Sequence, residues 1–283
     1  MFRKSFLSLV LLLCSCYLFA DPNWRENMKN LIYSPRYFGP NAFPLPDLRS
    51  ALIPYHSSLE FAAERHRAPG DYTKDYLFRF LFPVVKGRAA LEIFFIFKEE
   101  YQTTRETLFE RHADATSSPI PYAGDVVLTS SYQLLRHHPA LPDLLLHIGL
   151  KTASGGRLVD ARFTDAAAYW IHLALGRSLF ASPQASIQLL AMAGFYCWMT
   201  NDLVHRQNDA LLYGAGFAAR LHRFSLTSDL SGIYGYEDNG DRPIHLRNAL
   251  SCHFQYYSLS LRFSHGFQDR LYNSCALACT LTF

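Results

Sequence analysis

The chain ends in SCALACTLTF, residues 274–283, a run in which residue types alternate strictly and an aromatic residue, Phe283, comes last. Successive side chains of a strand point to opposite faces, so Cys275, Leu277, Cys279 and Leu281 would share an apolar face with Phe283. Most chain ends are polar and frayed. The ending therefore predicts a paired strand at the very C-terminus, with a role for its final aromatic ring.

The same alternation recurs in eleven earlier runs of roughly ten residues, each followed by turn-forming residues. The twelve predicted strands are 57–66, 72–82, 90–100, 124–135, 143–153, 165–176, 185–198, 209–220, 223–235, 244–254, 257–267 and 271–283. The stretches 166–175 and 186–199 would also suit buried helices, because periodicity alone does not decide short apolar runs.

The links between the predicted strands segregate by length. In an up-and-down arrangement, alternate links lie at the same end of the sheet. The links at one end are 67–71, 101–123, 154–164, 199–208, 236–243 and 268–270, and most of them are longer than the links at the other end. The two shortest links, 221–222 and 255–256, both lie at that other end. A compact soluble sandwich gives no reason for this segregation. Outer-membrane β-barrels have it, because their periplasmic turns are short and their extracellular loops long.

Composition agrees with a barrel rather than a helical membrane protein. Hydrophobic residues make up 49% of the 283 residues and charged residues 18%, yet the mean hydropathy is −0.02. A protein with several membrane helices would be apolar on average. Because a sheet in lipid cannot leave edge N–H and C=O groups unpaired, the runs predict an all-β fold, a transmembrane antiparallel up-and-down β-barrel of about twelve strands. A secreted soluble β-rich protein is the main competitor.

The first 56 residues precede the barrel, which we predict to span 57–283. Residues 1–20 have the charged start, short apolar run and small cleavage residue of a signal peptide. A lipoprotein signal acylated at Cys16 is the alternative. We predict a proline-rich N-terminal arm at residues 21–56. Its Tyr33, Tyr37 and Phe38 could plug the lumen or dock at the periplasmic mouth, or the arm is simply a linker that lets the first strand start.

The cysteine count bears on disulfide bonds, and the charge balance bears on nucleic acid as a partner. Four cysteines remain after cleavage, and Cys275 and Cys279 would lie about 13 Å apart on one strand face, too far to bridge. We interpret them as small apolar residues. The mature chain carries 25 basic residues (27 less Arg3 and Lys4) and 24 acidic residues, so nucleic acid is not expected as a partner.

The closing strand, together with the signal peptide and the repeated alternation, resembles bacterial outer-membrane β-barrel proteins. Such proteins typically end in a strand whose final residue is Phe or Trp, which the barrel-assembly machinery reads. The resemblance implies that Phe283 is an assembly signal, that the chain resides in the outer membrane of a Gram-negative bacterium, and that outer-membrane lipid and the assembly machinery are its partners. It identifies no subfamily.

Ionisable residues on the polar faces are the candidates for function. The lumen-lining candidates are Glu60, Glu64, Asp75, Arg79, Glu92, Lys98, His147, Lys151, His172, Asp229, Arg247, His253 and Arg262. Charges of both signs can line a pore and select solutes, or they can pair across a filled interior and only hold the barrel together. We predict a small pore or transporter for a small solute, with a structural or surface-binding barrel as the alternative.

An outer-membrane lipid hydrolase is the second alternative. It would need a nucleophile and a base placed together, as in the outer-membrane phospholipase and lipid A deacylase barrels, which carry a His-x-Ser pair on one strand. Ser264 and His265 are adjacent and so point to opposite faces. His137, His138 and His205 fall in links. We therefore predict no catalytic residue, no metal site and no cofactor.

Overall fold

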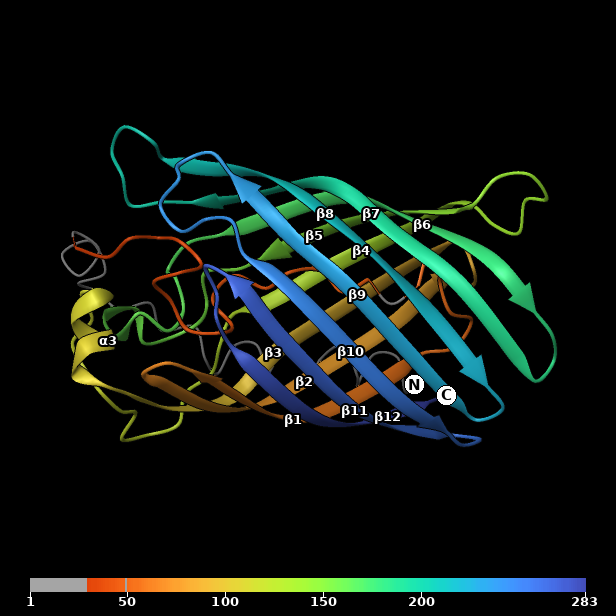
Figure 1. The fold of residues 1–283 in the computed structure, drawn as a ribbon, viewed down its shortest axis with the longest axis horizontal. Coiled ribbons are helices and arrows are strands. Elements are labelled where there is room, and N and C mark those ends of the chain that lie inside the picture. Colours follow the sequence, from red (N-terminus) through yellow and green to blue (C-terminus); the bar gives the residue numbers. More distant parts are fainter. Residues whose placement is uncertain (1–29, 49) are drawn as a thin grey trace, which may run out of the picture.

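The computed structural model describes residues 30–48 and 50–283. Its twelve strands form one closed antiparallel barrel (Figure 1). The strands are β1 (Ser58–Ala68), β2 (Asp71–Val85), β3 (Ala89–Thr103), β4 (Val126–Leu135), β5 (Asp143–Lys151), β6 (Ala168–Ala181), β7 (Ala185–Met199), β8 (Gln207–Leu221), β9 (Phe224–Gly235), β10 (Ile244–His253), β11 (Tyr257–Gln268) and β12 (Asn273–Thr282). A short helix, α3 (Arg105–Glu110), and a 3-10 turn, η1 (Leu158–Asp160), lie in the links. The predicted signal peptide, the alternative at Cys16 and residues 21–29 of the arm lie outside the described residues.

The barrel closes where its first strand meets its last. β1 pairs with β12 in an unbroken antiparallel register that runs from Ser58 opposite Thr282 to Arg67 opposite Asn273. Beyond it, Ser57 and Phe283 exchange two backbone hydrogen bonds of 3.0 Å each. The prediction of a twelve-stranded up-and-down barrel is confirmed. The two stretches that also suited helices lie in β6 and β7.

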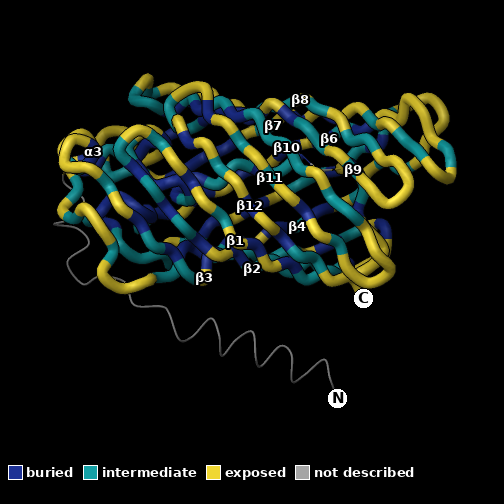
Figure 2. Tube along the Cα trace, turned by 60° about the horizontal axis from the view of Figure 1, so that its bottom comes forward, coloured by how far each residue is buried: buried dark blue, intermediate teal, exposed yellow. Residues whose placement is uncertain are grey.

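The outer face of the barrel is apolar and the inner face is mixed. In Figure 2 exposed and buried residues alternate along the strands. In β12, Leu277 is exposed while Ala276 and Ala278 are buried. The four cysteines of the described chain are free thiols, and Cys275 and Cys279 flank Leu277 on the outer face, so interpreting them as apolar residues was correct. No helix among the described residues is long and apolar enough to cross a membrane.

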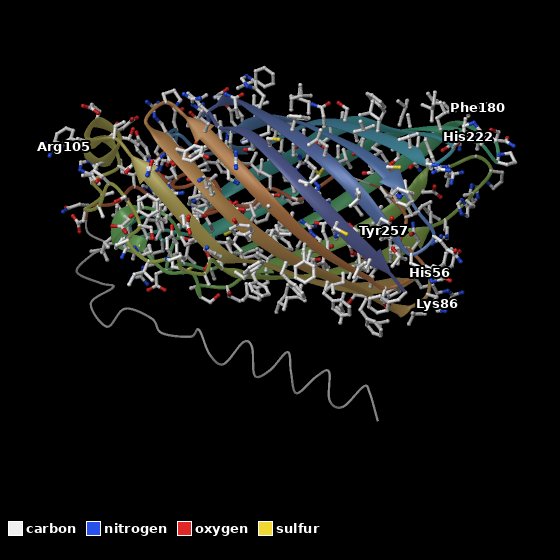
Figure 3. All side chains as sticks on the ribbon, turned by 90° about the horizontal axis from the view of Figure 1, so that it is seen from below. His56, Lys86, Arg105, Phe180, His222 and Tyr257 are labelled. Carbon is white, nitrogen blue, oxygen red and sulfur yellow. The ribbon has the colours of Figure 1, made fainter. Side chains whose placement is uncertain are left out.

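The two ends of the barrel differ in the length of their links. Figure 3 shows Arg105 of α3 at one end, and His56, Lys86 and His222 at the other. We name these the long-loop end, which carries 104–125 and 152–167, and the short-turn end, which carries 86–88 and 222–223. The longest links lie at the long-loop end, as predicted. The prediction that both of the shortest links lie at the other end was wrong, because the two-residue link 69–70 lies at the long-loop end.

The N-terminal arm runs through the inside of the barrel. At the long-loop end, the indole Nε1 of Trp198 donates to the carbonyl of Tyr33 at 2.7 Å, and the rings of Phe43 and Trp198 pack edge to face at 5.5 Å. Towards the short-turn end, Gln133 accepts from the amide of Ile53 and donates to the carbonyl of Ala51, both at 2.9 Å. Of the alternatives given for the arm, the structure shows the one in which the arm lies inside the lumen.

Deleting Phe283 should lower the yield of folded barrel. The deletion removes two backbone hydrogen bonds at the closing seam, which contribute about 1–3 kcal/mol together, and a ring that is 67% exposed at the edge of the outer face. The folded fraction is read from the mobility shift between boiled and unboiled samples. Phe283→Trp keeps an aromatic ring and should fold like the wild type. Equal folding of the shortened chain would show that the last residue is dispensable.

Candidate functional site

The lumen has two unlike walls. The inward side chains of β4 to β8 are largely apolar or small, and they pack with the arm in one core that includes Val127, Leu145, Trp170, Leu190, Met192 and Leu212. The inward side chains of β9 to β12 and β1 to β3 carry most of the charges. The arm therefore packs on the apolar wall, because contact between apolar side chains removes their surface from water. The opposite side of the arm faces the charged wall.

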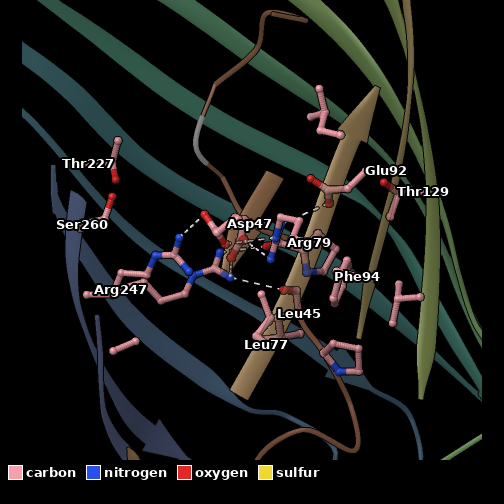
Figure 4. A pocket seen from close by; sticks show the side chains of 18 of the residues that line it. Leu45, Asp47, Leu77, Arg79, Glu92, Phe94, Thr129, Thr227, Arg247 and Ser260 are labelled. Atoms are coloured by element: carbon pink, nitrogen blue, oxygen red, sulfur yellow. Dashed lines mark hydrogen bonds and ion pairs between the residues drawn. The ribbon is translucent and has the colours of Figure 1, made fainter. Parts of the chain in front are cut away.

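A cavity of about 770 Å³ lies beside the arm, and it is lined by residues of the charged wall and also by Thr129, His147 and His172 of β4 to β6. Its lining begins near Tyr55 and Ser58 at the short-turn end and reaches Asn41 and His66 further up. Figure 4 shows part of it, with Asp47 of the arm between Arg79 and Arg247. The volume is in the usual range for sites that bind small molecules.

Most of the predicted lumen residues lie on the inner face. Those that line the cavity are Glu60, Glu64, Arg79, Glu92, His147, His172, Asp229, Arg247 and Arg262. Asp75 and Lys151 also face inward but are completely buried. His253 lies at the short-turn rim, exposed, where its ring bonds the hydroxyl of Ser225 at 2.8 Å.

The prediction for Lys98 was wrong. The register between β2 and β3 passes from Tyr76 opposite Lys98 to Leu77 opposite Ile96, so Phe97 is an extra residue on β3. A β-bulge of this kind shifts the alternation by one position. Lys98 consequently lies on the outer face, 3.0 Å from Glu100, and Glu99 points inward, 1% exposed.

Arginines and carboxylates form a paired network in the middle of the lumen. The carboxylate of Asp47, in the arm, forms ion pairs with the guanidinium groups of Arg79 and Arg247, each at 3.2 Å. Arg79 also contacts Glu92 at 3.1 Å, and Arg247 contacts Asp229 at 2.7 Å. Arg262 pairs with Glu60. The arm is therefore tied electrostatically to the charged wall as well as packed on the apolar wall.

A second network lies inside the barrel at the long-loop end, and its central residue comes from a link. Arg162, fully buried, contacts Asp71 at 2.8 Å, Glu99 at 3.0 Å and the hydroxyl of Thr73 at 2.6 Å. Arg111 contacts Asp71 at 2.6 Å. Burial alone would lower the pKa of Arg162, but the carboxylates of Glu99 and Asp71 outweigh it, so this pKa is raised and the residue stays charged.

Sequence reasoning missed Arg162, Asp71, Glu99 and His66. Arg162 lies in a predicted link, where an arginine is normally solvated. It turns inward because the backbone on either side of η1 is left-handed, with φ of 66° at Arg157 and 53° at Ala161. The amide of Gly39 then donates to the carbonyl of Ala161 at 2.8 Å, which joins this link to the arm. No sequence pattern marks such a fold-back.

Lys151 holds a link in place rather than lining the cavity. Its ammonium lies 2.7 Å from Asp125 and donates to the hydroxyl of Thr164 at 2.9 Å. Asp125 in turn accepts from the amides of Ser154 and Gly155. The charges of this pair therefore hold the links 104–125 and 152–167 together, and Asp125 also borders the cavity.

Two lumen histidines bond a serine hydroxyl. His66 lies 2.7 Å from the hydroxyl of Ser274 and 2.8 Å from the carboxylate of Asp75, so a serine, a histidine and a carboxylate meet there from β12, β1 and β2 rather than as a His-x-Ser pair on one strand. His147 and His172 stack with ring centroids 5.0 Å apart, and the hydroxyl of Ser131 lies 3.1 Å from His147 Nδ1 without a carboxylate bonded to the ring. A His-x-Ser sequence occurs at 56–58, where the arm joins β1. Within the described chain no hydrogen bond joins His56 to Ser58, and His56 is exposed.

Comparison with known proteins places the fold. No protein-family model matches the sequence, and no curated protein matches it. Among solved structures, the COG4313 outer membrane channel from Pseudomonas putida F1 is similar, at 14% identity and a TM-score of 0.58 over 86% of this chain and 98% of that one. A KdgM porin is also similar, at 11% identity and a TM-score of 0.46 over 80% and 99%. The chain has the fold of bacterial outer-membrane β-barrels.

Proposed function

We propose that this chain is an outer-membrane channel for a small polar solute, and that its own N-terminal arm restricts the lumen. The observation that carries the proposal is the cavity of about 770 Å³, which runs along the inside of a closed barrel and is lined on one side by charges of both signs. Outer-membrane lipid would contact the apolar outer face. Recognition of Phe283 by the barrel-assembly machinery belongs to the same proposal.

The chemistry of the cavity favours a polar solute. The side chains of Arg79, Arg247 and Arg262 are 14–19% exposed although each is paired. Their guanidinium groups therefore retain surface that can donate hydrogen bonds to a solute. Opposed charges lining a narrow lumen also create a transverse field that orients dipolar molecules.

The arm and the Arg162 network together restrict passage at the long-loop end. The arm packs on Trp198 and is bonded to the link that carries Arg162. Solute that enters the cavity from the short-turn end therefore meets the arm before it reaches the other side. Passage through the barrel would require the arm to shift along the charged wall.

The full chain should give a small conductance in planar bilayers, and deletion of residues 30–48 should increase it. The deletion empties the lumen of the segment that fills it, while the apolar wall that it exposes costs stability. Both proteins must first show the mobility shift of a folded barrel. Folded protein that never conducts, with or without the arm, would favour the structural or surface-binding alternative.

Asp47→Asn should shift ion selectivity towards anions and make the conductance fluctuate more. The substitution removes the carboxylate that Arg79 and Arg247 share. The net charge of the lumen becomes more positive by one, and the arm loses two ion pairs. Selectivity is measured as the reversal potential in a potassium chloride gradient.

Asp238→Asn is the matched control for this substitution, because Asp238 is an exposed loop carboxylate. It should leave the reversal potential unchanged. An unchanged potential in Asp47→Asn as well would show that ions do not pass this network. Hydrolysis of phospholipid by the folded wild type, abolished by replacing His66, would instead support the hydrolase alternative.

A further inference from the structure

Three potential metal ligands meet in the wall of the cavity. Glu64 and His66 are two positions apart on β1 and so point to the same side, and Asp75 on β2 lies directly opposite Glu64 in the register. One ligand atom from each residue lies within 4.8 Å of the other two. His66 Nε2 is 2.8 Å from Asp75 Oδ2 and 3.6 Å from Glu64 Oε2.

These separations suit a shared cation. A four-coordinate ion with bonds of 2.0–2.2 Å holds its ligand atoms roughly 3.3 Å apart, between the two separations seen here. The other ring nitrogen, His66 Nδ1, lies 2.7 Å from the hydroxyl of Ser274. A metal-binding histidine commonly makes such a bond with its second nitrogen, which fixes the orientation of the ring.

An unpartnered oxygen gives independent support. The side chain of Asp75 is fully buried, and its Oδ1 has no hydrogen-bond partner among the described residues. Its Oδ2 accepts from Asn41 at 2.6 Å, and within the described chain no arginine or lysine lies within ion-pair distance of it. Within the described chain, the imidazole of His66 is the one group in reach that can carry a counter-charge for this buried carboxylate. When the imidazole is neutral, the carboxylate is unbalanced, which is costly in a low-dielectric interior.

The site is open on one side. Glu64, His66 and Ser274 line the cavity, while Asp75 lies behind them against Asn41 of the arm. A hydrated ion in the cavity can therefore reach the ligands and keep water in a further coordination position.

The geometry points to a binding site for a first-row divalent cation such as Zn²⁺, held by Glu64, His66 and Asp75. One nitrogen and two carboxylate donors match Zn²⁺ and its neighbours in the series, whereas Ca²⁺ and Mg²⁺ prefer oxygen alone. The ion would supply the counter-charge of Asp75 and tie β1 to β2 beside the arm. This site does not depend on whether the barrel conducts solute.

Zinc binding by the refolded full chain tests the site. The protein carries no histidine tag, and His137 and His138 are changed to alanine in every sample to remove the adjacent pair of exposed histidines. Equilibrium dialysis against ZnCl₂ should give about one Zn²⁺ per chain. His66→Ala should abolish binding, and Asp75→Asn should weaken it by at least the roughly 10- to 100-fold that loss of a partner outside the ligand set costs. Co²⁺ in place of Zn²⁺ should give the visible absorption of a low-coordinate site.

His172→Ala is the matched control, since His172 is a buried lumen histidine outside the cluster. It should bind zinc like the parent protein. Glu64→Gln provides a second variant if His66→Ala fails to show the mobility shift of a folded barrel. No zinc on the folded parent, or equal loss in His172→Ala and His66→Ala, would overturn the site and indicate that a proton on His66 balances Asp75.

Discussion

Closure of the sheet is the constraint on which the rest of this structure depends. In lipid, each strand N–H and C=O must find a partner within the protein, and the pairing of β1 with β12 completes the circle. Once the circle is closed, every second side chain is forced inward whatever its chemistry. The barrel therefore has an interior that must be filled, paired or left to water.

This chain deals with its interior in two ways. Along β4 to β8 the inward side chains form an apolar surface, and the arm covers it with Tyr33, Phe38 and Phe43. Along the other strands arginines and carboxylates neutralise one another, and Asp47 brings the arm into that network. The cavity lies beside the arm and has residues of both walls in its lining, because the arm does not fill the lumen completely.

The sequence predicted the architecture well because alternation and link length follow directly from the physics of a barrel. Twelve strands, their inward faces and the free cysteines were all readable in this way. Lys98 was misplaced because a single extra residue, Phe97, inverts the pattern without any glycine or proline to mark it. Arg162 was missed because its role depends on a link folding back into the lumen, which is a tertiary event. His66 was not among the predicted lumen residues. The sequence does not show that it contacts Asp75, because that contact depends on the register in which Glu64 of β1 lies opposite Asp75 of β2.

The course of the arm also limits the order in which the barrel can be made. The arm enters beside β1 at the short-turn end, and its other described end lies by Trp198 and Asn201 at the long-loop end. A closed barrel has no side entrance, so an arm added afterwards would have to thread past the paired arginines in the middle. An arm already lying on β4 to β8 would need only the β1–β12 seam to zip shut around it. The segment made first would then act as the template on which the strands made last are closed.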